Sequence, residues 1–227
     1  MKKLLFVSSV LIMFMIAPMA MADTLTVNRV AGYFPGPAGE FTLSGNDLAG
    51  FQAYYADSVK DVGTWDPSIQ SFCIERNEYV SMGSTYIFQL NTAAVAGGIA
   101  GGSPDPLSVG AAYLYYQFSQ GILAGYDYIP GAGREASALA LQNALWMLED
   151  ELAFDAANPF IITVAGIFAD PKANNNGQYP VLVLNVYNRD GSLAQDMLVT
   201  VPEPATMLLL GSGLLGLAGF ARRRFKK

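Results

Sequence analysis

The central part of the sequence predicts an α+β fold, a β-rich antiparallel sheet assembly (sandwich-like) with two inserted helices. Two observations predict it. Short runs rich in β-branched and aromatic residues are separated by Gly, Pro, Asn and Asp, which is typical of antiparallel strands. Between an early and a late group of such runs lie two longer stretches in which apolar residues recur at helical spacing. A segment of this size can bury a core as one domain without disulfide bonds.

The first group of predicted strands occupies the front of the domain. Its runs are 24–31, 40–43, 51–55, 71–80 and 85–90. The segment 91–106 that follows contains Gly97-Gly98 and Gly101-Gly102. Because paired glycines are too mobile to stay regular, we expect a flexible connection there.

Two helices are expected next. Asp105-Pro106 opens the first, since proline is tolerated in a first helical turn, and Gly121 ends it. The second covers 134–151, where one apolar stripe is formed by Ala138, Leu141, Leu145, Leu148 and Leu152. Gln142 is at the edge of this stripe and is therefore expected at or near the core.

Three further strands are expected after the helices, at 160–168, 180–187 and 193–201. The tetrapeptide Asn188-Arg189-Asp190-Gly191 between the last two predicts a hairpin turn. The globular domain therefore covers 23–200.

Residues 1–22 have the pattern of a signal peptide. Lys2-Lys3 precede an apolar stretch, 4–16, and Ala20-Met21-Ala22 supplies small residues at the alternate positions that signal peptidase recognises. We expect cleavage before Asp23. The alternative, a buried N-terminal helix, does not explain why the cationic start and the small-residue end occur together.

Residues 201–227 have the pattern of a membrane anchor. Pro202-Glu203-Pro204 is followed by an uncharged run, 205–221, and then by the basic tail Arg222-Arg223-Arg224-Phe225-Lys226-Lys227. At about 1.5 Å per residue the run would make a helix of roughly 25 Å, slightly shorter than a hydrocarbon core. Clustered cations stay in the cytoplasm, so the domain before the helix is expected outside. A permanent anchor and a removable C-terminal signal both fit this layout.

The same tail closely resembles the PEP-CTERM sorting signal of Gram-negative bacteria. The resemblance implies processing by an exosortase near Pro202-Glu203-Pro204, in organisms that secrete extracellular polysaccharide. Exosortase, signal peptidase and the membrane are thus the expected partners during export. The expected final location is the cell surface, the outer envelope or the extracellular matrix.

Charge and composition exclude several functions. Between Asp23 and Glu203 the chain has six Lys and Arg residues against all 19 Asp and Glu residues, a net charge of 6 − 19 = −13. Such a segment repels phosphates, so we expect no nucleic-acid partner. The chain has no histidine, which excludes the usual hydrolase triads and the commonest zinc ligand.

No metal or cofactor site is predicted. The acidic run Glu149-Asp150-Glu151 and the carboxylates of Asp57, Asp61 and Asp66 lack the spacing of a calcium-binding loop. No phosphate-binding or dinucleotide-binding glycine motif occurs either. We expect that the protein is not an enzyme.

Cys73 is the only cysteine of the chain and lies in the apolar run Phe72-Cys73-Ile74. An unpaired thiol in an exported protein has three explanations: a buried inert side chain, an intermolecular disulfide, or a covalent bond to a group other than sulfur.

Phe72-Cys73-Ile74, followed by Leu141-Gln142-Asn143-Ala144-Leu145-Trp146, is similar to the cysteine and glutamine motifs of bacterial thioester domains of the TQXA type. The resemblance implies an internal thioester between Cys73 and Gln142 that acylates nucleophiles on a target surface. The chain departs from the family at Leu141, where the family has threonine, and in the short separation of the two motifs.

Two function classes follow. The first is an exported cell-surface or matrix protein, associated with biofilm or exopolysaccharide, that attaches covalently to a surface protein or polysaccharide through this thioester. The second is a non-covalent glycan-binding or purely structural matrix protein with an inert buried Cys73. A polysaccharide-acting enzyme is a third reading, and it needs paired carboxylates in a cleft, which the sequence does not place.

Overall fold

The computed structural model describes residues 22–34, 36, 38–61 and 63–202. In these residues the main feature is a six-stranded sheet in which every neighbouring pair is antiparallel, in the order β3-β2-β1-β4-β7-β8. The strands are β1 (Thr24–Asn28), β2 (Phe41–Ser44), β3 (Ser68–Ser71), β4 (Thr85–Asn91), β7 (Val181–Tyr187) and β8 (Met197–Thr200).

The sheet curls until its two edges meet. The chain beyond β3 runs beside β8: Cys73 and Met197 form an isolated antiparallel bridge, and the N–H of Leu198 donates to the carbonyl of Phe72 at 3.2 Å. The Ser71 hydroxyl donates to the Leu198 carbonyl at 2.7 Å. This closure covers both edges with hydrogen bonds. The prediction of a β-rich antiparallel α+β fold is confirmed, whereas the sandwich was wrong, because one curled sheet replaces two facing sheets.

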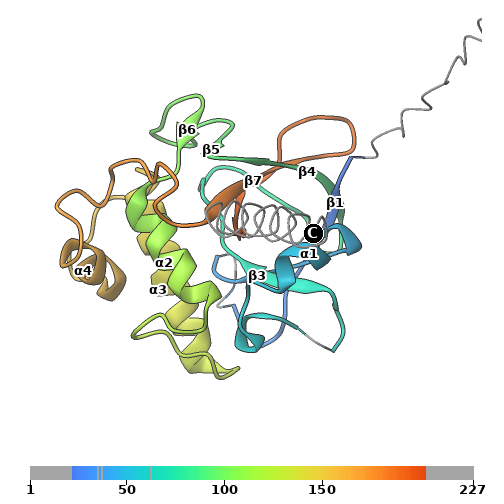
Figure 1. The fold of residues 1–227 in the computed structure, drawn as a ribbon, viewed down its shortest axis with the longest axis horizontal. Coiled ribbons are helices and arrows are strands. Elements are labelled where there is room, and N and C mark those ends of the chain that lie inside the picture. The colour runs from blue at the N-terminus through green and yellow to red at the C-terminus, as the bar shows by residue number, and fades with distance from the viewer. Residues whose placement is uncertain (1–21, 35, 37, 62, 203–227) are drawn as a thin grey trace, which may run out of the picture.

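Three helices lie together on one side of the strands, at the left of Figure 1. They are α2 (Val109–Ser119), α3 (Ala132–Leu148) and α4 (Pro159–Ala165). Smaller elements complete the described fold: α1 (Ala49–Gln52), the 3-10 turns Asn46–Leu48 and Asp57–Val59, and the short pair β5 (Ala93–Ala94) and β6 (Asp105–Pro106).

The core lies between the curled sheet and these helices. Tyr115 and Phe118 of α2 are fully buried, and the ring of Phe118 packs edge-on against that of Phe72 with centroids 5.0 Å apart. The Tyr115 hydroxyl is hydrogen-bonded to that of Tyr55 at 2.8 Å and donates to the Gln70 carbonyl at 2.9 Å. Helix and sheet are therefore joined by both apolar packing and buried hydrogen bonds.

Two predicted strands are helical instead. The run 160–168 forms α4, because Asn158 caps the helix by accepting from the N–H of Phe160 at 2.9 Å and Pro159 suits the first turn. The run 51–55 falls in α1 and the turn after it. Aromatic residues in both runs, and β-branched residues in 160–168, favour strands locally, but in α4 the cap and the burial of Phe160, Ile161 and Val164 determine the element.

Other predicted boundaries also change. The first helix begins at Val109 rather than at Asp105-Pro106, because the Ser108 hydroxyl caps it by accepting from the N–H of Ala111 at 3.2 Å. The predicted strand 71–80 is not formed as a regular strand. β3 ends at Ser71, and beyond it in this run only Cys73 forms an isolated bridge. The hairpin turn at 188–191 is confirmed, with Gly191 at φ 85° and its N–H bonded to the Asn188 carbonyl at 2.9 Å.

The segments predicted at the two ends of the chain lie largely outside the described residues. This holds for the signal peptide 1–22 up to its last residue, for the helix 205–221 and for the basic residues Arg222, Arg223 and Arg224. Among the residues that are described, no helix is both long and apolar enough to cross a membrane.

Candidate functional site

Cys73 lies where the closing edges of the sheet meet. It is buried, with 4% of its surface exposed, and its backbone is fixed by the bridge to Met197. The thiol is free, as expected for the only cysteine of the chain. The side chain is therefore held on a rigid segment of the fold.

Gln142 lies on α3 and faces this segment. It is fully buried, and its side-chain amide forms two hydrogen bonds with the backbone of Cys73. The Cys73 N–H donates to Oε1 at 3.1 Å, and Nε2 donates to the Cys73 carbonyl at 2.9 Å. The structure thus brings together the two residues that carry the thioester resemblance, although 69 positions separate them in the chain.

Two chemical roles suit this contact. The amide satisfies both backbone groups of Cys73, which is what a purely structural glutamine would do between a helix and a sheet edge. The same contact also holds the amide carbonyl beside the residue that carries the thiol, with an N–H already bonded to the oxygen on which charge would develop during attack.

The electrostatic surroundings keep the thiol protonated. Burial raises the pKa of the Cys73 thiol far above its usual value, and the negative charge of Glu75 raises it further. The guanidinium of Arg29 acts in the opposite direction on this pKa. Cys73 is therefore not a preformed thiolate, and any reaction must depend on proximity.

A cavity of about 320 Å³ lies beside Cys73. Its lining includes Cys73, Arg29, Phe41, Trp146 and Tyr79. Tyr79 is 79% exposed and Trp146 lies one turn after Gln142 on α3, so the cavity connects the protein surface with the neighbourhood of the thiol.

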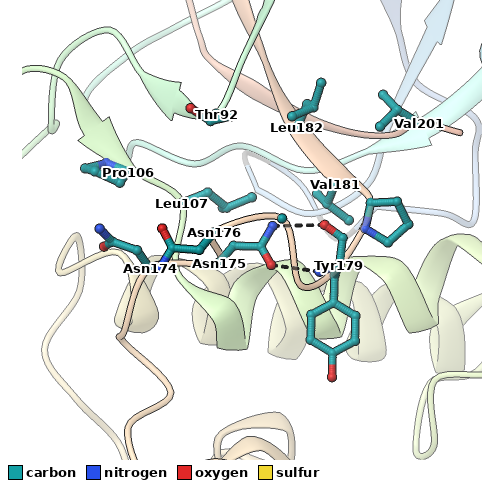
Figure 2. A pocket seen from close by; sticks show the side chains of 12 residues that line it. Thr92, Pro106, Leu107, Asn174, Asn175, Asn176, Tyr179, Val181, Leu182 and Val201 are labelled. Atoms are coloured by element: carbon teal, nitrogen blue, oxygen red, sulfur yellow. Dashed lines mark hydrogen bonds between the residues drawn. The ribbon is translucent and has the colours of Figure 1, made fainter. Parts of the chain in front are cut away.

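A second cavity, of about 250 Å³, lies between the start of α2 and β7. Figure 2 shows that Leu107, Val181 and Leu182 line one part of it and a loop of asparagines another. Asn175 closes this loop, accepting from the Tyr179 N–H at 2.9 Å and donating to the Tyr179 carbonyl at 3.0 Å. Since none of its lining residues is charged, we assign no chemistry to this cavity.

The acidic residues considered in the sequence have structural roles. Glu149 accepts hydrogen bonds from the N–H and hydroxyl of Ser108, at 3.2 and 2.6 Å. Glu151 accepts from the backbone N–H groups of Arg76 and Ile99, at 2.8 and 2.6 Å. Both carboxylates fasten loops to the end of α3.

Sequence reasoning missed a different acidic cluster, formed by Glu75, Glu78 and Asp196. The first two are three positions apart directly after Cys73, which is a weak local signal. Asp196 joins them only because the sheet closes on itself, and no sequence pattern predicted that closure.

Of the sorting motif, Pro202 is the last residue that the structure describes, and Glu203 and Pro204 lie beyond it. A family model described as the PEP-CTERM protein-sorting motif matches residues 200–224. No curated protein and no solved structure gives a significant match to the chain. The resemblance to thioester domains receives no support from these comparisons.

The matched motif supports an exported protein that is sorted by an exosortase. It also implies that the C-terminus anchors the chain in the membrane before cleavage. Export places the domain where disulfides form and where free thiols are exposed to oxidation, so the state of the lone Cys73 becomes a functional question.

Proposed function

We propose that this exosortase-sorted protein works at the cell surface or in the extracellular matrix, in association with exopolysaccharide, and attaches covalently through a thioester between Cys73 and Gln142. The observation that carries the proposal is the pair of hydrogen bonds between the Gln142 amide and the Cys73 backbone. It places an acyl donor against the backbone of the residue that carries the only thiol of the chain.

The bond-forming step is an acyl transfer within the chain. The Cys73 sulfur attacks the amide carbon of Gln142, a C–S bond forms, the C–N bond breaks, and the thiol proton leaves with the nitrogen as ammonia. A primary amide is a poor acyl donor, so the step needs reactants held together away from water. The burial of both residues in the contact between the sheet edge and α3 supports this step.

The Cys73 N–H has a specific part in this step. It donates to Oε1 of Gln142 at 3.1 Å, the oxygen that becomes negatively charged in the tetrahedral intermediate. One such preorganised donor contributes about 10²–10³-fold in rate in other acyl-transfer sites. This contribution offsets part of the cost of a thiol that burial keeps protonated.

The attachment step consumes the thioester. An amine or hydroxyl on a neighbouring protein or polysaccharide attacks the carbonyl of Gln142, forms an amide or ester, and releases Cys73 as a thiol. The cavity lined by Arg29, Trp146 and Tyr79 is the route for this nucleophile.

The intact mass of the full-length protein, purified in detergent, tests the bond. We expect a mass lower than that of the unlinked chain by one ammonia, and addition of one methylamine at Gln142 when this amine is supplied. Cys73→Ala and Gln142→Glu should each abolish the ammonia loss, whereas Gln120→Glu, at the half-buried C-terminal cap of α2, should retain it. A mass without ammonia loss, together with a thiol that is fully alkylated after unfolding, would falsify the proposal.

A non-covalent glycan-binding or structural matrix protein is the second candidate. It is favoured by the complete pairing of the Gln142 amide with the Cys73 backbone, which already gives both residues a structural role. In that case the alkylated thiol would be found in every variant that keeps Cys73.

A further inference from the structure

The carboxyl groups of Glu75, Glu78 and Asp196 lie together where the sheet closes. Glu75 and Glu78 belong to the irregular segment after β3, and Asp196 directly precedes β8. One oxygen from each of the three groups lies within 4.8 Å of the others. Two distant parts of the chain thus present three acidic groups to one point.

Glu75 is the unusual member of this cluster. Only 1% of its surface is exposed, and neither carboxylate oxygen has a hydrogen-bond partner among the described residues. None of the three carboxylates forms a salt bridge with another residue that the structure describes. A buried carboxyl group without a partner is costly, so this one requires a ligand or another compensation.

The other two carboxylates are fixed by hydrogen bonds. Asp196 accepts through Oδ1 from the N–H of Val186 at 3.0 Å, and through Oδ2 from the N–H of Val95 at 2.9 Å and from Asn185 at 2.8 Å. Glu78 accepts from the Asp196 N–H at 3.2 Å. A carboxylate has about four acceptor positions, so lone pairs remain available on both.

We propose that Glu75, Glu78 and Asp196 bind a calcium ion. The three groups offer only hard oxygen ligands, which Ca²⁺ prefers, and neither nitrogen nor sulfur that would favour zinc. Ca–O distances of about 2.3–2.6 Å allow two ligand oxygens to lie up to about 5 Å apart, whereas Mg²⁺ limits them to about 4 Å. The limit of 4.8 Å on the spacing of the three oxygens is compatible with calcium, and water would complete its coordination.

Without a cation, the folded state disfavours the ionised forms of Glu75 and Glu78. Burial, followed by repulsion from Asp196, raises the pKa of Glu75 to about 10 and that of Glu78 to about 7. Burial disfavours the charged form of each group, and the acidic neighbours repel it. A divalent cation would offset both effects.

Binding would also tie the segment after Cys73 to β8. Gln195 already donates to the Glu75 carbonyl at 2.6 Å, so the backbone is positioned while the carboxylate remains available. The calcium site does not depend on the thioester, because no ligand comes from Cys73 or Gln142. Cys73→Ala should therefore bind calcium as the wild type does, which separates failure of one proposal from failure of the other.

Calorimetric titration of the full-length protein in detergent, after treatment with a chelator, tests the site. We expect one Ca²⁺ per chain with a dissociation constant on the order of 10⁻⁴–10⁻³ M, the range of extracellular calcium modules, and weaker binding of Mg²⁺. CaCl₂ should also raise the thermal midpoint above that in NaCl of matched ionic strength.

Glu78→Gln is the main variant, because this half-buried residue can keep its hydrogen bond with the Asp196 N–H through the amide oxygen. It should weaken calcium binding about tenfold or more, as should Glu75→Gln. Glu135→Gln, at a half-buried position near the start of α3, is the matched control and should bind like the wild type. The assignment is overturned if the wild type shows no saturable binding, if Mg²⁺ binds as tightly, or if folded Glu78→Gln retains full affinity.

Discussion

Glu149 shows how one buried carboxyl group can determine the pH dependence of stability. It caps the end of α3 and accepts from the N–H and hydroxyl of Ser108, the residue that caps α2. Burial raises its pKa to about 7, against the opposing effect of the Ser108 hydrogen bonds, and the charges of Asp105 and Asp150 raise it further. The folded state therefore favours the protonated form.

The sign of the effect follows by linkage. Because the pKa in the folded state lies above the unfolded value of about 4.5, the contribution of Glu149 is complete below pH 4.5 and is lost as pH rises through about 7. We expect the wild type to lose on the order of 3 kcal/mol across this window relative to Glu149→Gln. Urea unfolding of both proteins at pH 4.5 and pH 8 measures this difference. Parallel pH profiles for the two proteins would contradict it.

At the scale of elements, α3 is fastened to the sheet by a buried ion pair. Arg134, in its first turn, forms a two-pronged contact with Glu40, which directly precedes β2, and its Nε lies 2.8 Å from a Glu40 oxygen. Tyr126 donates to Glu40 at 2.7 Å, and the guanidinium lies 3.5 Å from the centroid of the Tyr33 ring. Both charged residues are almost completely buried.

Removing one charge of this pair should be costly. We expect Arg134→Met to lower the free energy of unfolding by about 3–5 kcal/mol, because Glu40 is left buried without its partner. The double variant Arg134→Met with Glu40→Gln should recover much of this loss. Arg76→Met, which removes an exposed arginine stacked on Trp146, should cost less than about 1 kcal/mol. Equal losses for the two single arginine variants, measured by urea unfolding, would refute the role of the buried pair.

Local patterns predicted those elements whose side chains alternate or repeat with a clear period. The strands β1, β2, β4 and β7 and the long helix α3 lie close to their expected ranges. α4 was missed because its β-branched and aromatic residues favour a strand, although Phe160 and Val164 form a buried helical stripe. The Asn158-Pro159 capping signal was present in the sequence and would have identified this helix.

The sequence predicted only those features of the candidate site that follow from local structure. The apolar stripe of α3 correctly predicted that Gln142 would be buried near the core. Its contact with Cys73 joins residues 69 positions apart, and the approach of Asp196 to Glu75 requires the sheet to close between segments about 120 positions apart. Local periodicity carries no information on such pairings, so only the thioester resemblance linked Cys73 to Gln142.

For the whole molecule, the folded domain extends almost to the sorting motif. β8 ends at Thr200, and the N–H of Val201 still donates to the Pro180 carbonyl at 2.8 Å. Pro202, the first residue of the tripeptide, follows directly. Because proteases act on backbone that is free of secondary structure, we expect the folded domain to restrict the access of exosortase to a cleavage site near this motif.

Moving the motif away from β8 should therefore speed processing. We expect a short Gly-Ser linker between Val201 and Pro202 to raise the rate of cleavage several-fold in a host with its exosortase, and deletion of Val201 to lower it. A pulse-chase measurement of the shift from precursor to cleaved form gives both rates. The same linker placed in the hairpin turn at 188–191 should leave the rate unchanged, since it does not alter the distance from β8 to Pro202. If both insertions gave the same rate as the wild type, the local structure at Val201 would not limit processing, and cleavage would be controlled within the membrane by the tail alone.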